Sequence, residues 1–231
     1  ISNFLLADED FPHYLSMFDG ATIMSAIAMK TSKIGLSFTA ASSYTDPYNI
    51  ARQSLSLDKI SKGRASVNVV TSNPGGMVNF SRGHLGKADQ YPMQKEFMEI
   101  VLGLWDTYED DAFPRNKAMG EFLKPNKMHT INYRGKYFSV DGPLNLSRSV
   151  QGRPVLYTAG GSPAIVEIAT TYTDGAFIAG HSLEDALYTA NALRSKLREK
   201  NRNPENFVVA TSQNAIVGKT DTEAQHKYME L

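Results

Sequence analysis

The segment of the sequence best suited to bind an anion is Ala159-Gly160-Gly161-Ser162-Pro163, which lies between a strand pattern and a helical pattern. Ser162 can cap the helix and Pro163 can occupy its first position, while the two glycines let the backbone approach a ligand. Free N–H groups and the positive end of the helix dipole would then face a phosphate. The alternative is an ordinary strand-to-helix turn that requires glycine, and spacing alone does not separate the two.

Polar side chains also interrupt or follow three apolar strand patterns. Asn68 stands inside one of them, Thr39, Ser42 and Ser43 close another, and Asp8 follows a third. A buried carboxamide needs a hydrogen-bond partner, and at the carboxyl end of a barrel strand that partner is commonly a ligand. The alternative is a polar layer that is satisfied inside the core. These side chains are therefore candidate ligand contacts at one rim of a barrel.

Other kinds of catalytic site have little support in the sequence. It contains no cysteine, which excludes thiolate metal ligands and cysteine nucleophiles. The five histidines form no HxxxH or HxH pair, and no GxSxG motif is present. The acidic run Glu109-Asp110-Asp111 is more typical of a solvated face than of a metal site. We expect no metal centre and assign no catalytic base.

The charge balance argues against polyanionic partners. Lysine plus arginine and aspartate plus glutamate number 24 each, so the formal net charge is zero. Nothing at the level of the whole chain favours a nucleic acid or an acidic membrane surface. No apolar run approaches the roughly 18 residues that a membrane span requires. We expect a soluble, cytoplasmic protein.

The elements that must position these side chains alternate between strand and helix. Strand patterns occur at Asn3 to Ala7, Ile34 to Ala40, Ala65 to Val70, Val155 to Ala159, Gly175 to Ala179 and Phe207 to Val217. Helical patterns occur at Asp46 to Ile60, Pro92 to Asp106, Ala164 to Tyr172 and Ser182 to Asn201. Units of roughly 30 residues predict parallel strands joined by right-handed crossovers. The fold class is α/β.

The length of 231 residues lies near the upper limit for one hydrophobic core, so we expect a single domain over residues 1–231. The regular alternation of strand and helix patterns is interrupted at about residues 107–153. This segment is predicted to be an extended βα insertion that carries a hairpin around Tyr133 to Lys136. The chain starts on what looks like the end of a strand, and Asp221 to Leu231 looks like the start of a helix. We expect it to be a fragment of a longer chain.

Taken in order along the chain, several segments resemble the bacterial-luciferase-like flavin monooxygenases. They are similar to the branch that contains the nitrilotriacetate, dibenzothiophene-sulfone and long-chain alkane monooxygenases. The segments are FLLAD (Phe4 to Asp8), DPYNIARQSLSLDKISKGRASVNVVTS (Asp46 to Ser72), Asn79-Phe80, LWDTYEDDAF (Leu104 to Phe113) and INYRGKYFSVDGPLNLSRSVQGRPVLYTAGGS (Ile131 to Ser162). This resemblance implies a (β/α)8 TIM barrel of the bacterial luciferase-like type, incomplete in this fragment.

The resemblance also implies a cofactor and partners. Reduced FMN, supplied by an NAD(P)H:flavin reductase, would be bound at the carboxyl rim of the barrel, and O2 would be the co-substrate for oxygenation of a small organic substrate. The resemblance further suggests a homodimer. Two alternative functions stay open at this stage: a deazaflavin-dependent oxidoreductase that transfers hydride without O2, and a non-catalytic flavin-binding barrel. A third alternative is that the truncated chain is itself inactive.

Transferred position by position, the resemblance implies a set of cofactor-binding residues. They are Asp8, Thr39, Ser42, Asn68, Lys87, Tyr91, Gly160, Gly161 and Ser162. Some positions depart from the family pattern: Val67 replaces a tryptophan, Gln90 an arginine and Lys87 a histidine. Gly161 replaces the first serine of the family's AGSS phosphate loop. A lysine can pair with phosphate but cannot replace a neutral imidazole in proton transfer.

Overall fold

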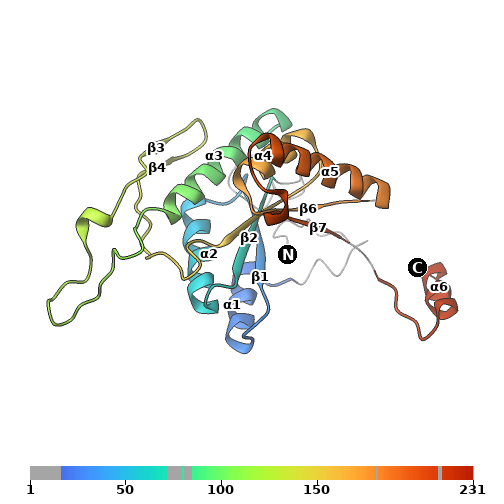
Figure 1. Cartoon of the computed structure of the whole chain (residues 1–231), viewed down its shortest axis with the longest axis horizontal. Helices are drawn as coiled ribbons and strands as arrows, with labels where there is room; N and C mark the ends of the chain where they lie inside the picture. Colours follow the sequence, from blue (N-terminus) through green and yellow to red (C-terminus); the bar gives the residue numbers. More distant parts are fainter. Residues whose placement is uncertain (1–16, 72–79, 81–84, 181, 213–214, 231) are drawn as a thin grey trace.

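The structure is a computed structural model that describes residues 17–71, 80, 85–180, 182–212 and 215–230. Within these ranges, five strands form one sheet in the order β1-β2-β5-β6-β7, and every neighbouring pair is parallel. The strands are β1 (Leu36–Ala41), β2 (Ala65–Val70), β5 (Val155–Ala159), β6 (Gly175–Ile178) and β7 (Val208–Thr211). The strands fan out from the centre of Figure 1 as part of a barrel wall. The predicted α/β class is confirmed.

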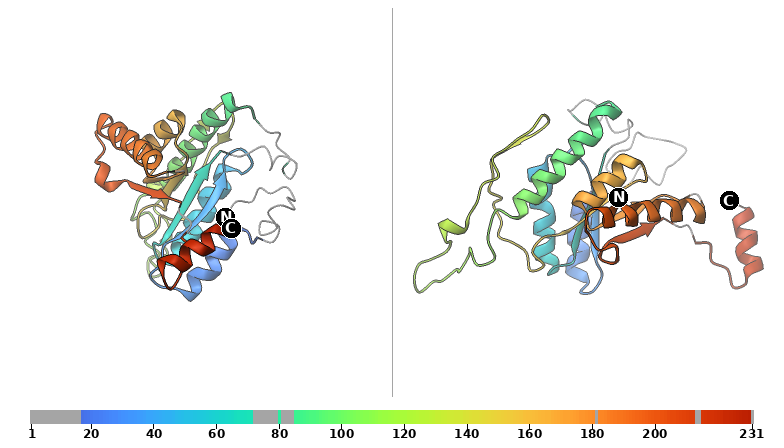
Figure 2. Two further views of the ribbon diagram at one scale, coloured as in Figure 1. Left: turned by 90° about the vertical axis from the view of Figure 1, so that its right-hand side faces the viewer. Right: turned by 45° about the horizontal axis from the view of Figure 1, so that its top comes forward.

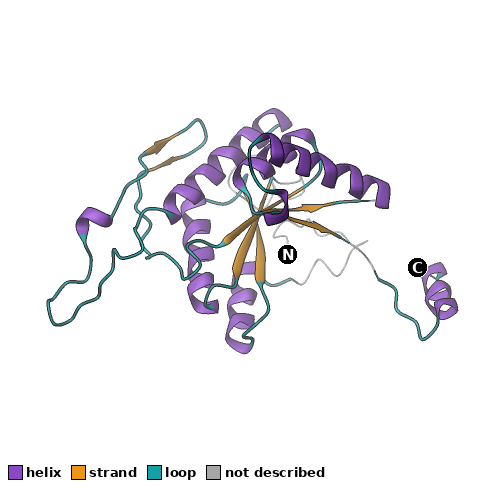
Figure 3. Cartoon of the chain, in the orientation of Figure 1, coloured by secondary structure: helices purple, strands orange, loops and turns teal. Residues whose placement is uncertain are grey.

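Five helices follow the outer side of this curved sheet (Figures 1 and 3). They are α1 (Gly20–Lys30), α2 (Pro47–Ser61), α3 (Lys87–Trp105), α4 (Pro163–Tyr172) and α5 (Leu183–Glu199). Single 3-10 turns occur at Pro125–Lys127 and Pro204–Asn206, and α6 (Asp221–Met229) lies apart from the sheet and buries none of its residues. No helix in the described ranges is both long enough and apolar enough to cross a membrane.

The local signals that predicted α2 and α5 operate as expected. The carboxylate of Asp46 accepts the backbone N–H of Tyr48 at 3.0 Å, and Pro47 occupies the first helical position of α2. Lys62 ends this helix in the left-handed conformation. Ser182 caps α5 by accepting the backbone N–H of Asp185 at 3.1 Å.

The start of α3 differs from the prediction. The apolar stripe begins at Pro92, but the helix begins at Lys87, so Pro92 lies inside it. Because this proline lacks the N–H that would bond the carbonyl of Ala88, the helix continues through Pro92 with one backbone hydrogen bond fewer. The earlier start places both Lys87 and Tyr91 on the helix.

Other predicted elements differ from the structure at their ends or lie outside the described ranges. The predicted strand Phe207 to Val217 is too long, because β7 is an edge of the described sheet and pairs with β6 only over Val208–Thr211. Helix α1 has no counterpart among the predicted elements. The predicted strand Asn3 to Ala7 lies outside the described residues.

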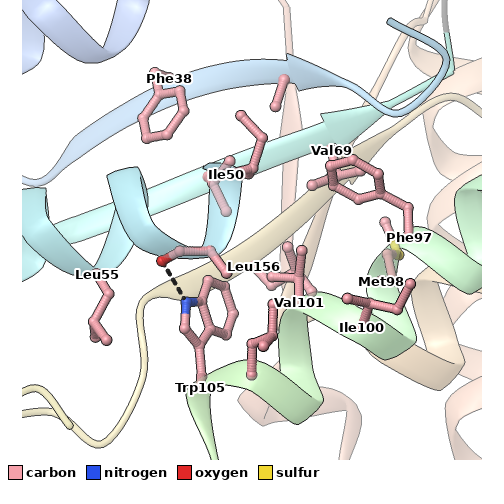
Figure 4. Close-up of a cluster of buried hydrophobic side chains, with 14 of the residues drawn as sticks. Phe38, Ile50, Leu55, Val69, Phe97, Met98, Ile100, Val101, Trp105 and Leu156 are labelled. Carbon is pink, nitrogen blue, oxygen red and sulfur yellow. Dashed lines mark hydrogen bonds between the residues drawn. The ribbon is translucent and has the colours of Figure 1, made fainter. Parts of the chain in front are cut away.

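The main core lies between the sheet and helices α1 to α3. Phe97, Met98, Ile100 and Val101 of α3 are all fully buried there. The indole N–H of Trp105 donates to the carbonyl of Ala51 at 3.0 Å, which joins α3 to α2 (Figure 4). A second, smaller core under α4 and α5 packs against β6. Together these cores fix the helices that begin near the carboxyl ends of the strands.

Side chains along each strand alternate between the helices and the opposite side of the sheet. Leu36, Phe38 and Ala40 of β1 pack into the main core, so Ser37 and Thr39 point to the other side. We call that other side the inner face. By the strand register it carries Ser37, Thr39, Ser66, Asn68, Val155, Tyr157, Gly175, Phe177, Val208 and Ala210.

The segment between α3 and β5 is an excursion from the barrel wall (Figure 2). It contains the predicted hairpin, formed by β3 (Tyr133–Arg134) and β4 (Ser139–Val140). The carboxylate of Glu96 on α3 accepts backbone N–H groups from three consecutive residues of the hairpin turn, Lys136 to Phe138, at 2.8 to 3.3 Å. One α3 carboxylate therefore anchors the hairpin to the outside of that helix.

Candidate active site

The strand register brings three polar residues into one layer of the inner face. Two of them were predicted from the sequence, and the third was not. Thr39 of β1 lies beside Asn68 of β2, and Asn68 lies beside Tyr157 of β5. The carboxamide N–H of Asn68 donates to the hydroxyl of Thr39 at 3.3 Å. The structure therefore brings two of the residues predicted from the sequence, Thr39 and Asn68, into direct contact.

The carboxamide oxygen of Asn68 is the most informative atom of this layer. It is buried and accepts no hydrogen bond from any residue in the described ranges. Leaving a buried acceptor unsatisfied costs about 1–3 kcal/mol. This oxygen is positioned to accept an N–H or O–H from a group placed against the inner face.

Tyr157 was missed as a candidate, although the alternation in its strand places it on the same face as Asn68. Its ring lies over Gly175 of β6, where any Cβ would overlap the ring and would also lie 2.6 Å from the carbonyl oxygen of Val208. The Tyr157 and Phe177 rings have centroids 5.1 Å apart. Burial, followed by the charge of Asp174, raises the pKa of the Tyr157 hydroxyl. The residue is therefore a neutral aromatic wall beside the carboxamide.

Ser42 lies at the carboxyl end of β1 but does not face this layer. It is fully buried, and its hydroxyl donates to the carbonyl of Val70 at 3.1 Å. Its backbone N–H donates to the same carbonyl at 2.9 Å. The donor capacity of Ser42 is thus used to hold the ends of β1 and β2 together, which leaves only its oxygen lone pairs for a ligand.

A second cluster forms where α4 begins, after β5. Ser162 caps α4 by accepting the backbone N–H of Ile165 at 3.3 Å. The hydroxyl of Tyr91, which comes from α3, lies 3.3 Å from the same Ser162 oxygen. Two predicted residues separated by 71 positions therefore meet at the positive end of a helix.

Glycine is found at two positions of this cluster for different structural reasons. Gly160 has a φ of +128°, which strongly favours glycine, and its N–H donates to the carbonyl of Phe177 at 2.9 Å. Gly161 has no such backbone requirement. A Cβ there would lie 3.2 Å from both the hydroxyl oxygen and the methyl carbon of Thr189 on α5. Thr189 is a second residue that the sequence analysis missed.

Lys87 and Asp8 complete the predicted set. Lys87 is exposed at the first position of α3, one turn before Tyr91, so the two side chains lie on the same side of the helix. No contact of Lys87 with the glycine turn is present in the described residues. Asp8 lies outside the described ranges, so its position relative to the two clusters is not defined.

The acidic run after α3 is occupied by ion pairs. Asp111 contacts Lys124 and Lys127, and hydrogen bonds from these lysines lower the pKa of its carboxyl to about 2. Among the described residues, no group of three or more histidine, cysteine, aspartate or glutamate side chains could hold a metal ion.

A cavity of about 400 Å³ lies elsewhere, along the side of β1. Asp19 of the α1 cap, Thr39, Tyr44 and Asp46 contribute to its lining. It follows the edge of the described sheet and shares only Thr39 with the two clusters. Among the described residues, this cavity and the two clusters are therefore separate features.

A family model and the relatives found by sequence comparison indicate the same kind of protein. The family described as luciferase-like monooxygenase matches residues 1–231. The chain is 44% identical over 222 residues to N-acetyl-S-(2-succino)cysteine monooxygenase of Bacillus subtilis (strain 168), covering 95% of the chain and 50% of that protein. It is 39% identical to nitrilotriacetate monooxygenase component A of Aminobacter aminovorans, covering 90% of the chain and 46% of that protein.

Comparison with solved structures gives relatives with the same fold. A riboflavin lyase structure with modified FMN and riboflavin aligns with a TM-score of 0.88 and 31% identity, covering 97% of the chain and 51% of that structure. DmoA from Hyphomicrobium sulfonivorans aligns with a TM-score of 0.85 and 32% identity, covering 94% of the chain and 47% of that structure. The chain spans about half the length of the relatives it matches.

Proposed function

The chain belongs to the luciferase-like monooxygenase family, and from this premise we propose that its protein is the FMN-dependent monooxygenase component of a two-component system. An NAD(P)H:flavin reductase supplies reduced FMN, and O2 is the co-substrate for oxygenation of a small organic molecule. We propose a cytoplasmic location for the monooxygenase and its reductase, because the reductase uses NAD(P)H. We interpret residues 1–231 as one barrel domain with an insertion at about 107–153, and the protein as a homodimer.

The observation that carries this proposal is the meeting of Tyr91 and Ser162 at the start of α4. In the described part of the chain, the backbone N–H groups of Gly161, Ser162 and Ala164 have no acceptor. A helix N-terminus with free N–H groups favours a phosphate. Gly160, Gly161, Ser162 and Tyr91 would therefore hold the FMN phosphate, and Lys87, one turn away on the Tyr91 side, adds an attractive charge.

The polar layer fits the remainder of the cofactor. The unpartnered Asn68 oxygen can accept a hydrogen bond from the ring or the ribityl chain, while Thr39 keeps the carboxamide in that orientation. Ser42 would contribute only as an acceptor, because its hydroxyl proton is committed to Val70. We keep Asp8 as a proposed contact on the strength of the family resemblance.

Bound reduced flavin supplies the electrons that activate O2, and the protein residues supply position, polarity and shielding. Asn68 would orient the flavin through one hydrogen bond, and the rings of Tyr157 and Phe177 would present apolar surface that excludes water beside it. The Tyr157 hydroxyl is protonated at neutral pH, and burial raises its pKa further above the ordinary value. The residue that moves protons on the substrate is left unassigned.

The two alternatives named from the sequence have less support. The curated relatives reported above are named as monooxygenases, which favours neither a deazaflavin-dependent hydride transfer nor a non-catalytic barrel. Anaerobic titration of the protein with reduced FMN, followed by admission of O2, tests all three. Binding followed by oxidation at a rate and with a spectral course different from those of free reduced FMN supports the proposal, binding without such a difference favours the non-catalytic barrel, and absence of binding overturns the FMN assignment.

The phosphate seat is tested by Ser162→Glu. The added carboxylate would occupy the anion position at the α4 N-terminus and repel the phosphate, so the dissociation constant of reduced FMN should rise at least about tenfold. Thr220→Glu is the matched control, because Thr220 caps α6 through the N–H of Glu223 and lies apart from the sheet. Unchanged FMN affinity in Ser162→Glu would contradict the assignment.

A further inference from the structure

The contact between Gly161 and Thr189 singles out a residue of α5 that none of the sequence patterns indicated. Thr189 lies in the second turn of α5 and is 8% exposed. Both its hydroxyl oxygen and its methyl carbon would lie 3.2 Å from a Cβ at position 161. The threonine side chain therefore fills the space that a side chain on the glycine turn would otherwise occupy.

The hydroxyl of Thr189 differs in its bonding from the hydroxyls of the threonines in α4 and at its end. Those of Thr170, Thr171 and Thr173 donate to the carbonyl four residues earlier, at 2.7, 2.8 and 2.9 Å. The Thr189 hydroxyl makes no hydrogen bond to its own helix or to any other described residue. The Thr189 side chain is largely buried, and its free hydroxyl donor is available to a ligand, which would supply the hydrogen bond that the helix does not.

The surroundings of this hydroxyl indicate what kind of ligand that is. It faces Gly161, whose N–H, like those of Ser162 and Ala164, has no acceptor in the described part of the chain. The hydroxyls of Ser162 and Tyr91 lie at the same turn. All of these groups can donate hydrogen bonds, so together they favour an anionic oxygen.

We propose that the Thr189 hydroxyl donates a hydrogen bond to the phosphate of the bound flavin, and that residue 161 is glycine because Thr189 occupies its side-chain space. This inference rests on the proposed function, since it adds a residue of α5 to the same phosphate seat. The hydroxyl that a side chain on the turn would supply comes instead from the neighbouring helix.

The test compares two flavins that differ only in the phosphate. The protein and its variants are titrated anaerobically with reduced FMN and with reduced riboflavin. Thr189→Val keeps the shape of the side chain and removes the hydroxyl, and it should weaken FMN binding at least about tenfold while leaving riboflavin binding within about twofold. Thr189→Ser keeps the hydroxyl and should retain most of the FMN affinity.

Thr170→Val is the matched control, because Thr170 is also a buried helical threonine but its hydroxyl is satisfied within α4. It should leave the ratio of FMN to riboflavin affinity unchanged. Equal weakening of both flavins by Thr189→Val, or retention of the full FMN preference, would overturn the role of Thr189. A wild-type protein that does not prefer FMN to riboflavin would instead overturn the phosphate seat itself, and the Thr189 proposal with it.

The glycine gives a reciprocal test. Gly161→Ser should place its Cβ against Thr189, displace the threonine hydroxyl and lower the FMN preference. Adding Thr189→Ala should restore the preference, because the space is freed and the serine brings its own hydroxyl. Additive losses in the double variant would contradict the exchange of one hydroxyl for the other.

Discussion

The two faces of the parallel sheet differ in what they contribute. On the helix side, Phe38, Val67 and Leu156 are at most 4% exposed and pack into one continuous apolar core. On the inner face, Asn68 and Tyr157 are partly exposed and carry polar or aromatic groups. The same strands thus present an apolar and a polar surface, one residue apart.

This difference separates folding from chemistry. Helix-side residues exclude water, and a polar one among them, Thr158, is fully buried and bonded within the core to Gln94 and Val69. Inner-face residues contribute less buried apolar area and hold the unsatisfied Asn68 oxygen. Substitutions on the two faces should therefore affect different measurements, and the following predictions test that separation.

The largest expected effect is on the helix side. Phe97 of α3 is fully buried, and its ring packs edge-on against Phe138 of the hairpin, with centroids 5.8 Å apart. Phe97→Ala should lower the free energy of unfolding by about 3–5 kcal/mol, because it removes buried apolar surface and leaves a cavity. Urea titration followed by fluorescence of Trp105, the only tryptophan, measures this loss.

The matched change on the inner face is Val155→Ala in β5. Val155 is only partly buried, so the loss should stay below about 1.5 kcal/mol. A cost equal to that of Phe97→Ala would show that the inner face is as important for folding as the helix side, and would contradict the separation.

An intermediate effect is expected where the inner face is tightly packed. Gly175→Ala would force its Cβ against the Tyr157 ring and to within 2.6 Å of the Val208 carbonyl oxygen. We expect a loss of about 1–3 kcal/mol in unfolding free energy, together with weaker flavin binding because Tyr157 is displaced. Gly35→Ala is the control, since its nearest neighbour, the carbonyl oxygen of Arg64, lies 3.9 Å away. Equal behaviour of the two variants would contradict the close packing at Gly175.

The strand and helix order was predictable because it depends on local patterns. Alternation and apolar runs gave β2 and β5 with correct ends, and the helical patterns that begin at Asp46 and Ser182 gave the starts of α2 and α5. The predicted start of α3 was wrong because its apolar stripe begins at Pro92, although the helix extends back to Lys87. Local chemistry therefore locates most elements and misjudges those with unusual interiors.

The site was predictable only in part. The segment Gly160 to Ser162 was identified from its own chemistry, but Thr189 could not be, because its hydroxyl resembles that of any helical threonine until the packing of α5 on the glycine turn is known. Gln94 is a similar case. It lies on α3, and its amide donates to Val69 of β2 at 2.9 Å and to Thr158 of β5 at 3.0 Å. Contacts between distant elements carry no local signature in the sequence.

The smallest effect concerns the outer side of α3. The carboxylate of Asp89 accepts hydrogen bonds from the ammonium of Lys136, at 2.7 Å, and from the hydroxyl of Tyr137. These hydrogen bonds, with the charge of Lys136, lower the pKa of Asp89. A carboxyl group whose pKa is lower in the folded protein stabilises the fold above its ordinary pKa, near 4, and that contribution is lost as the pH falls through the lowered value. The contact of the hairpin with α3 should therefore be constant from pH 7 to 5 and weaken below about pH 4.

Hydrogen-exchange protection of the backbone N–H groups of Lys136 and Tyr137 measures this contact. Glu96 accepts these N–H groups directly, so Asp89→Asn is needed to isolate the part due to Asp89. The variant should show lower protection at pH 7 and a weaker decline in acid; identical profiles would contradict the role of Asp89. Asp89 lies two residues before Tyr91, so FMN affinity measured on the same variant decides whether the outer side of α3 influences the phosphate seat. Unchanged affinity alongside a loosened hairpin would mean that the core contacts of α3 alone hold Tyr91 against Ser162, as the separation of the two faces implies.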